Sequence, residues 1–314
     1  MFSKETSKTG LRRLCSLAIL ASLLLQLCAC SHRRAASDAA NSTETRELVD
    51  GLGHRVRLPA KIDRVISLAP NLTEIVYAVG AGDRLVGDTT FCDYPPEAKQ
   101  VAKVGDTIHP NLETVVALRP QVVLVSTSSQ LESFTRQLEA QHIAVFITDA
   151  HNLETVFSSV ELLGELLGQQ EQAGRVASEL RSRAHSVEER VKGRNTVRVF
   201  YQLSAEPLYT AGKGSYITDM IRRAGGVSVT QDVESEWPRL SDEAALAAQP
   251  EAIIMATADS MGGGNTEVAA PLAKSPASRQ GRVYRINGDF LSRPGPRLIE
   301  GLEQIARALH PEAF

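Results

Sequence analysis

The sequence lacks the short motifs of the common nucleotide-binding and hydrolytic enzymes. It contains no GxxxxGK[ST] phosphate loop, no GxSxG nucleophile turn and no HExxH zinc motif. Gly212-Lys213-Gly214-Ser215 is interpreted as a turn that enters a helix, with Ser215 as the N-cap. The seven histidines never pair at the spacing of metal ligands, so a zinc or manganese site would need several of them to converge from distant loops. These absences favour a protein without catalysis, resident metal or cofactor.

The charges near the start of the chain are confined to residues 1–13. A positive segment is followed by an uncharged apolar run over residues 14–27, a length that suits a signal peptide and is short for a membrane span. The run ends in Leu27-Cys28-Ala29-Cys30, which resembles the lipobox of bacterial lipoproteins, where the last cysteine carries lipid and becomes the N-terminus. We therefore expect a signal peptide over residues 1–29 and lipidation of Cys30, with an ordinary signal peptide as the alternative. The basic residues of the positive segment are Lys4, Lys8, Arg12 and Arg13.

Over residues 30–314, basic residues are outnumbered by acidic ones and cysteine is scarce. Without residues 1–29, which carry four basic and one acidic side chain, the chain has a net charge of −6. An acidic protein of this kind is a poor candidate for nucleic-acid binding. Only Cys30 and Cys92 remain, so a lipidated Cys30 leaves no disulfide framework. Cys92 is predicted to be a small buried hydrophobic residue.

The next part of the chain predicts a tether, a hairpin and an α/β lobe. Residues 30–46 have no apolar periodicity and are interpreted as a flexible tether, and residues 47–63 as a small hairpin with Asp50-Gly51 at a turn. Short apolar runs then alternate with amphipathic stretches over residues 64–151. This alternation is typical of a parallel sheet with crossover helices. The strands are expected at residues 65–68, 85–87, 122–125 and 144–147.

A long helical segment separates this lobe from a second one. Helices are expected at residues 153–167 and 169–192, within a linker over 152–194. Strands resume at 197–201, 252–255 and 283–286 in a second lobe over 195–314. The fold class is therefore α/β, with two parallel-sheet, Rossmann-like lobes joined by a long rigid helix.

The two lobes share one internal similarity. Asn111-Leu-Glu113 precedes Pro120 and a buried strand, and Ser241-Asp-Glu243 precedes Pro250 and another. In both, the glutamate stands seven residues before the proline. Asn111 and Ser241 are interpreted as N-caps, which places each glutamate in a first helical turn where the helix dipole favours an acid. On spacing alone, matching halves and ordinary α/β construction explain this equally well.

Five stretches in order resemble the periplasmic cobalamin- and iron-complex-binding proteins that feed ATP-driven importers. The resemblance covers residues 64–311, and the Phe-Cys-Asp-Tyr-Pro-Pro stretch is most similar to the cobalamin branch. The stretches are Val65-Ile-Ser-Leu-Ala-Pro-Asn-Leu-Thr-Glu74, Phe91-Cys-Asp-Tyr-Pro-Pro-Glu-Ala98, Asn111-Leu-Glu-Thr-Val-Val-Ala-Leu-Arg-Pro120, Trp237-Pro-Arg-Leu-Ser-Asp-Glu243 and Asp289-Phe-Leu-Ser-Arg-Pro-Gly-Pro-Arg297.

The resemblance implies a monomeric binding protein of the periplasm or cell envelope, held to the membrane by its lipid. It implies a single Fe/B12 periplasmic-binding domain over residues 64–314 with a ligand cleft between the lobes. The transported ligand would be cobalamin or a related corrinoid, and the partner an ABC permease dimer in the inner membrane. Glu113 and Glu243 would dock onto that permease. The residues carried over to the cleft are Phe91, Tyr94, Trp237, Asp289, Phe290 and Arg293.

Two departures from the cobalamin pattern keep other ligands open. Thr107 and Ser126 stand where a cobalamin binder of this family has tryptophans. Haem binders of the family ligate iron with a tyrosine near the Tyr94 position, and His109 is a candidate axial ligand for either tetrapyrrole. The alternatives are therefore a haem or ferric-siderophore binder and, in a different class, an envelope tetrapyrrole chelatase, which the signal peptide and the unclustered histidines disfavour.

Overall fold

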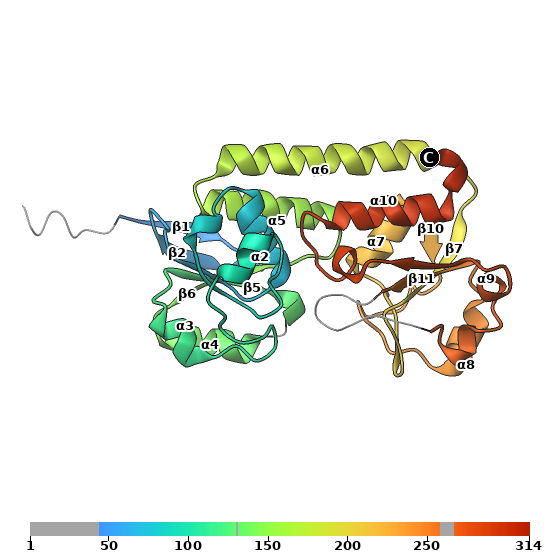
Figure 1. Cartoon of the computed structure of the whole chain (residues 1–314), viewed down its shortest axis with the longest axis horizontal. Coiled ribbons are helices and arrows are strands. Elements are labelled where there is room, and N and C mark those ends of the chain that lie inside the picture. Colours follow the sequence, from blue (N-terminus) through green and yellow to red (C-terminus); the bar gives the residue numbers. More distant parts are fainter. Residues whose placement is uncertain (1–43, 130, 258–266) are drawn as a thin grey trace, which may run out of the picture. The chain divides into compact units, whose positions relative to one another are not determined.

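A four-stranded parallel sheet forms the first lobe (Figure 1). The computed structural model describes residues 44–129, 131–257 and 267–314. The strand order is β4-β3-β5-β6, and the side chains of β5 are all buried, as the continuous apolar runs predict for a sheet covered on both faces. The elements of this lobe are β3 (Val65–Ser67), α2 (Pro70–Ala78), β4 (Leu85–Asp88), α3 (Leu112–Ala117), β5 (Val122–Ser126), α4 (Glu132–Ala140) and β6 (Ala144–Thr148).

The second lobe repeats this plan with the strand order β10-β7-β11-β12, again all parallel. Strand β10 was not predicted from the sequence, because Gly226-Val-Ser228 contains a single large apolar residue and forms no apolar run. A small antiparallel hairpin, β8 (Ser204–Ala205) with β9 (Leu208–Tyr209), follows β7. The remaining elements are β7 (Val197–Gln202), α7 (Tyr216–Arg223), β10 (Gly226–Ser228), α8 (Asp242–Ala248), β11 (Ala252–Ala256), α9 (Pro276–Arg279), β12 (Val283–Ile286) and α10 (Leu298–Leu309).

Two packed helices, α5 (Leu153–Leu166) and α6 (Gln170–Val191), lie between the lobes in sequence, and each ends within one residue of its predicted end. Asn152 and Thr155 form a capping box at the start of α5. Gly164 permits the close approach of the two helices, since a Cβ there would lie 2.1 Å from the Cβ of Ala173. With 22 residues, α6 is about 33 Å long.

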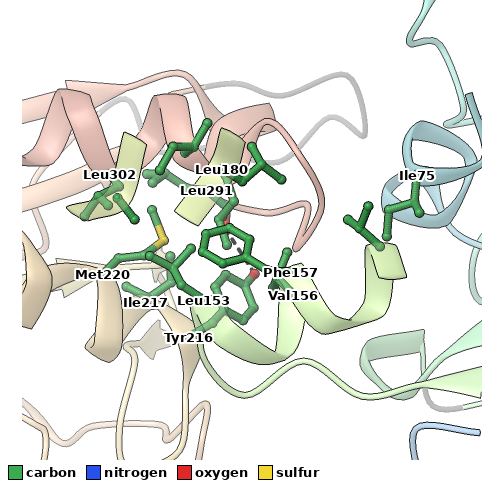
Figure 2. Close-up of a cluster of buried hydrophobic side chains, with 14 of the residues drawn as sticks. Ile75, Leu153, Val156, Phe157, Leu180, Tyr216, Ile217, Met220, Leu291 and Leu302 are labelled. Atoms are coloured by element: carbon green, nitrogen blue, oxygen red, sulfur yellow. Dashed lines mark hydrogen bonds between the residues drawn. The ribbon is translucent and has the colours of Figure 1, made fainter. Parts of the chain in front are cut away.

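The hydrophobic core runs from one lobe to the other through α5 (Figure 2). Leu153, Val156 and Phe157 of α5 pack beside residues of α7 and α10, and Ile75 of α2 belongs to the same buried cluster. The backbone N–H of Leu153 also donates to Asp219 Oδ2 of α7 at 3.1 Å. Because close-packed interiors resist deformation, this shared core holds the two lobes together. Its members from the second lobe include Tyr216, Ile217, Met220, Leu291 and Leu302.

A two-stranded hairpin precedes the first lobe, and its first strand begins at Thr45, two residues before the predicted start of the hairpin. Strands β1 (Thr45–Val49) and β2 (Arg55–Pro59) pair across a turn in which Asp50 Oδ1 accepts hydrogen bonds from the backbone N–H groups of Leu52 and His54. Within the described ranges, no helix has the length and apolar character needed to cross a membrane. Residues 1–43, which include Cys30, lie outside the described residues.

A candidate ligand site between the two lobes

A cavity of about 330 Å³ opens where segments of both lobes meet. In the first lobe the walls are formed by the segments that come directly after β3 and β5 in the chain. These two strands are neighbours in the sheet, and the chain continues from β3 toward one edge and from β5 toward the other. Ligands of open α/β sheets bind at such a switch point, beyond the carboxyl ends of the strands. The second lobe contributes the segment after β12. The lining residues are Ala69, Pro70, Asn71, Phe91, Thr107, Ile108, Ser129, Ser292, Arg293 and Pro294.

Arg293 forms the charged floor of this cavity. Its side chain is 1% exposed and its Nη1 pairs with Asp93 Oδ1 at 2.8 Å and with Glu74 Oε1 at 3.2 Å. Its Nη2 lies 3.1 Å from Asp289 Oδ1 and donates to the carbonyl oxygen of Phe91 at 3.3 Å. Three carboxylates thus surround one guanidinium, so the floor carries no uncompensated positive charge.

A second arginine of the same segment ties it to α2. Arg297 donates from Nε and Nη2 to the two oxygens of Glu74, at 2.9 and 2.6 Å. Its guanidinium carbon lies 4.1 Å from the ring centre of Tyr94 and 5.6 Å from that of Phe290, within the range of cation–π attraction. Burial raises the pKa of Glu74, and the hydrogen bonds and charges of Arg297 and Arg293 oppose that rise.

The backbone of the second lobe approaches α2 closely beside this ion cluster. A Cβ on Gly295 would lie 3.3 Å from the Cβ and carbonyl oxygen of Asn71, and Asn71 Nδ2 donates to the carbonyl oxygen of Pro294 at 3.2 Å. Glycine at 295 leaves room for this contact. The segment after β12 is therefore fastened to the first lobe by backbone contact and by charge.

Lys103 fixes the loop that carries Phe91 by hydrogen bonds to residues on either side of it. Its ammonium group donates to Asp88 Oδ1 at 2.7 Å and to the carbonyl oxygens of Cys92 and Ala98 at 3.1 and 3.0 Å. Burial raises the pKa of Asp88 to about 7, although the hydrogen bond and charge of Lys103 act in the opposite direction. Cys92 is buried and free, as predicted. These contacts fix the loop before any ligand arrives.

Two segments meet elsewhere between the lobes through His151. Its Nε2 lies 2.5 Å from Asp149 Oδ2, just after β6, and its Nδ1 contacts Glu236 Oε1 in the second lobe. Partial burial acts to lower the pKa of His151, but the hydrogen bonds and charges of Glu236 and Asp149 outweigh it and raise the pKa. Trp237, which follows Glu236 in the chain, packs edge-on against Tyr216, with ring centres 5.5 Å apart.

The structure distributes the predicted ligand residues over three places. Phe91 and Arg293 line the interlobe cavity, and Asp289 contacts Arg293. Tyr94 lines a separate cavity of about 380 Å³ that faces α6 and also contains Arg297. Phe290 flanks Arg297, whereas Trp237 packs against the main core. Contact of these six residues with a ligand stays a prediction.

Three charged residues of this site, Glu74, Asp93 and Arg297, were not predicted from the sequence, although all three lie in the stretches that carry the resemblance. The sequence does contain a sign of buried ion pairs. Glu74 is the one charged residue at the end of an uncharged stretch, and Arg293 and Arg297 lie in a second, mostly uncharged stretch. Charges inside apolar, helix-flanking segments are costly to bury unless they are paired. Such charges predict partners, but not which of the available opposite charges they meet.

Glu113 and Glu243 occupy equivalent helix positions in the two lobes. The N-cap predictions are confirmed: Asn111 Oδ1 accepts from the N–H of Thr114 at 2.9 Å, and Ser241 Oγ from that of Ala244 at 3.2 Å. Each glutamate is the second residue of its helix and is exposed. Three residues later, each helix exposes a large apolar side chain, Val116 at 38% and Leu246 at 53%. Residues three apart share a helix face, so both helices present a carboxylate beside an apolar group.

Comparisons with known proteins agree with this architecture. A sequence model of the family described as periplasmic binding protein matches residues 65–289. The chain is 32% identical over 305 residues to YvrC of Bacillus subtilis, named an ABC transporter substrate-binding lipoprotein, covering 94% of this chain and 96% of that one. It is 28% identical to the vitamin B12-binding protein of Vibrio cholerae, covering 80% of this chain and 90% of that one.

Solved structures show the same fold. The crystal structure of the vitamin B12-binding protein BtuF of Vibrio cholerae superposes with a TM-score of 0.71 at 28% identity, covering 80% of this chain and 97% of that one. A periplasmic heme-binding protein from Pseudomonas aeruginosa superposes with a TM-score of 0.69 at 25% identity, covering 81% and 94%. The two-lobed α/β fold is thus shared by proteins named for different tetrapyrroles.

Proposed function

Because the chain belongs to the periplasmic binding protein family, we propose that it is the substrate-binding subunit of an ABC importer and that its cargo is cobalamin or a related corrinoid. It captures the ligand between its lobes and delivers it to a permease dimer, without catalysis. The observation that supports this most directly is the cavity at the switch point of the first sheet, closed on its other side by the segment after β12. A site of this volume holds one edge of a macrocycle, with the remainder spread across the lobes.

The charge of the cavity favours a corrinoid over haem. Among the described residues of the lining, Arg293 is the only ionisable one, and Asp93, Asp289 and Glu74 neutralise it. A buried carboxylate needs a paired cation, and the described residues of this lining offer the two propionates of haem no uncompensated cation. The carboxamides on the rim of a corrin are neutral and need only hydrogen bonds.

The candidate iron ligands also lie in places that favour a corrinoid. Tyr94 packs its ring on Arg297 in the cavity that faces α6, away from the lining of the interlobe cavity. His109 is 82% exposed on a loop, beside Asp106 at 3.3 Å. A haem-binding site of this family would need one of these side chains at the centre of the cleft.

The shared core favours capture with little lobe movement. The helices α5 and α6 and the residues of α7 and α10 packed on them form one continuous cluster (Figure 2). Packed interiors shift between discrete arrangements and do not bend gradually, so wide hinge opening would require this core to come apart. A preformed site of this kind loses little ordering entropy on binding.

Cobalamin and haem have distinct visible spectra, which makes the test direct. Purified protein is incubated separately with cyanocobalamin and with haemin, passed through gel filtration, and the absorbance of the protein peak is recorded. We expect cyanocobalamin to co-elute at about one equivalent and haemin to be lost. Calorimetry then gives both affinities. Tight haem binding without cobalamin binding would reverse the ligand assignment, and binding of neither would return the cargo to the siderophore alternative.

A further inference from the structure

Two side-chain hydroxyls of the interlobe cavity have no hydrogen-bond partner among the described residues. They are Oγ1 of Thr107 and Oγ of Ser129, and both atoms are buried. The Ser129 side chain as a whole is only 6% exposed. Buried polar atoms in folded proteins are nearly always hydrogen-bonded, because an unpaired one forfeits its hydration. Because both residues line one cavity, a ligand bound there would supply the hydrogen-bond partners that these two hydroxyls lack.

Local structure holds these hydroxyls in place. Asp106 Oδ1 accepts hydrogen bonds from the N–H groups of Ile108 at 2.7 Å and His109 at 2.5 Å, which fixes the turn that carries Thr107. Ser129 ends a single 3-10 turn directly after β5, where the sheet fixes the chain. A site whose donors and acceptors are placed before binding gains affinity because little order is lost.

Two other polar side chains of the wall make contacts within the protein. Asn71 donates to the carbonyl oxygen of Pro294, and Arg293 is held by its three carboxylates. Ile108 also belongs to the lining, and because it is 68% exposed it offers apolar surface. The first-lobe wall, as far as its residues are described, therefore combines two hydroxyls with an apolar side chain and carries no charged side chain.

Building on the proposed function, we infer that the hydroxyls of Thr107 and Ser129 bind the ligand directly and select one with neutral hydrogen-bonding groups on its rim. A hydroxyl can both donate and accept, and a carboxamide offers both a carbonyl oxygen and an N–H group. A carboxylate in the same position would need a cation that this wall lacks. A corrin rim with carboxamides beside apolar ring substituents satisfies Thr107, Ile108 and Ser129 together.

The variants Thr107→Val and Ser129→Ala remove each hydroxyl with little change in shape. Calorimetry with cyanocobalamin should show each variant losing about twofold to twelvefold in affinity, the range of one net hydrogen bond. The unfolding midpoint of the ligand-free protein should stay the same or rise, because an unpaired buried hydroxyl is removed. Ser158→Ala, an exposed serine of α5, is the matched control and should change neither quantity.

A second probe tests the selectivity. In the heptamethyl ester of cobyrinic acid, rim esters accept hydrogen bonds but cannot donate them. The wild type should prefer cyanocobalamin over this ester, and the double variant should lose part of that preference. If the wild type binds no corrinoid, the proposed function fails. If it binds cyanocobalamin and both variants bind equally well, or if ligand-free stability falls in both, only the role of these hydroxyls is overturned.

Discussion

Arg297 of the second lobe and Glu74 of the first form a two-point ion pair, with Nε to Oε2 at 2.9 Å and Nη2 to Oε1 at 2.6 Å. Arg297 is the N-cap residue of α10, and Glu74 lies within α2. The Glu74 side chain is 2% exposed, so bulk water cannot take the place of Arg297 if that arginine is lost. Bidentate arginine–carboxylate pairs have a fixed geometry, and this one therefore sets where α2 meets the start of α10.

Removal of the guanidinium should destabilise the protein strongly. Arg297→Met leaves the Glu74 carboxylate buried with Arg293 as its remaining partner, and breaking a buried pair from one side typically costs about 3–5 kcal/mol. Urea unfolding measures the change. The double variant Arg297→Met with Glu74→Leu should recover much of the loss, because no uncompensated charge remains. Arg175→Met removes an exposed pair with Glu171 and should cost about 1 kcal/mol or less. An equal cost for the two arginines would contradict the importance of burial.

Much of the fold could be predicted because hydrophobic period and length are local properties. The predicted ends of the six-residue strand β7 and of the 22-residue helix α6 each lie within one residue of the observed ends. Strand β10 was not predicted, since Gly226-Val-Ser228 lacks an apolar run, whereas the equally short β3 lies within Val65-Ile-Ser-Leu68. Helix α2 begins directly at Pro70, because proline is tolerated in a first helical turn.

The site was less predictable because it is made by residues far apart in the chain. Resemblance indicated Phe91 and Tyr94 together, three positions apart, yet they line different cavities. No local pattern indicates on which side of a loop each ring lies. Likewise, the partners of Arg293 come from three segments of the chain, and only the tertiary structure brings them together.

Stability should depend on pH through His151. Its pKa is raised in the folded protein, so its contribution is fully present below the unfolded pKa of about 6.5 and is lost as pH rises through the folded value. The side chain is 47% exposed, which limits the contribution to about 1 kcal/mol or less. Urea midpoints of the wild type and His151→Gln should therefore differ most at and below about pH 6.5 and converge as the pH rises through the raised folded pKa. Glu236→Gln should behave like His151→Gln, and Glu234→Gln, two residues away, like the wild type. A constant difference across this range would exclude the ion pairs as its cause.

The two aromatic residues of the Phe91 loop should differ in their effect on binding. Phe91 lines the interlobe cavity, and truncation of a well-packed aromatic anchor typically costs about 2 kcal/mol or more, a loss of affinity above tenfold. Tyr94 reaches a ligand only if the ligand extends to Arg297, so Tyr94→Ala should cost less than Phe91→Ala. Calorimetry with cyanocobalamin measures both. The reverse order would move the ligand toward the cavity that faces α6, and Trp237→Ala tests the second lobe in the same assay.

Membrane attachment should depend on one cysteine. The lipobox-like Leu27-Cys28-Ala29-Cys30 predicts that Cys30 carries the lipid and that Cys28 is removed with the signal peptide. Cys30→Ser should abolish incorporation of labelled palmitate and move the protein from the membrane fraction to the soluble one. Cys28→Ser is the control and should retain both. Label that persists in Cys30→Ser would point to an ordinary secreted protein.

The paired glutamates should matter for delivery and not for folding. Glu113 and Glu243 are exposed, and an acid in a first turn contributes only about 0.3–1 kcal/mol to its helix. At an interface with a permease, loss of one partner of a close charge pair costs about 2–5 kcal/mol. Since Val116 and Leu246 stand beside them on the same helix faces, the proposed contact on each lobe joins a charge to apolar surface.

The double variant Glu113→Arg with Glu243→Arg separates these two roles. We expect near-normal unfolding and ligand affinity but loss of cobalamin uptake in cells and of permease association in pull-downs. Glu171→Arg with Glu189→Arg makes the same change of net charge on α6, which lies across the molecule from α3 and α8 (Figure 1), and should leave uptake intact. If both double variants reduce uptake equally, net charge is responsible. If the Glu113 and Glu243 variant transports normally, the two glutamates serve their helix ends alone, and the permease recognises another part of the surface.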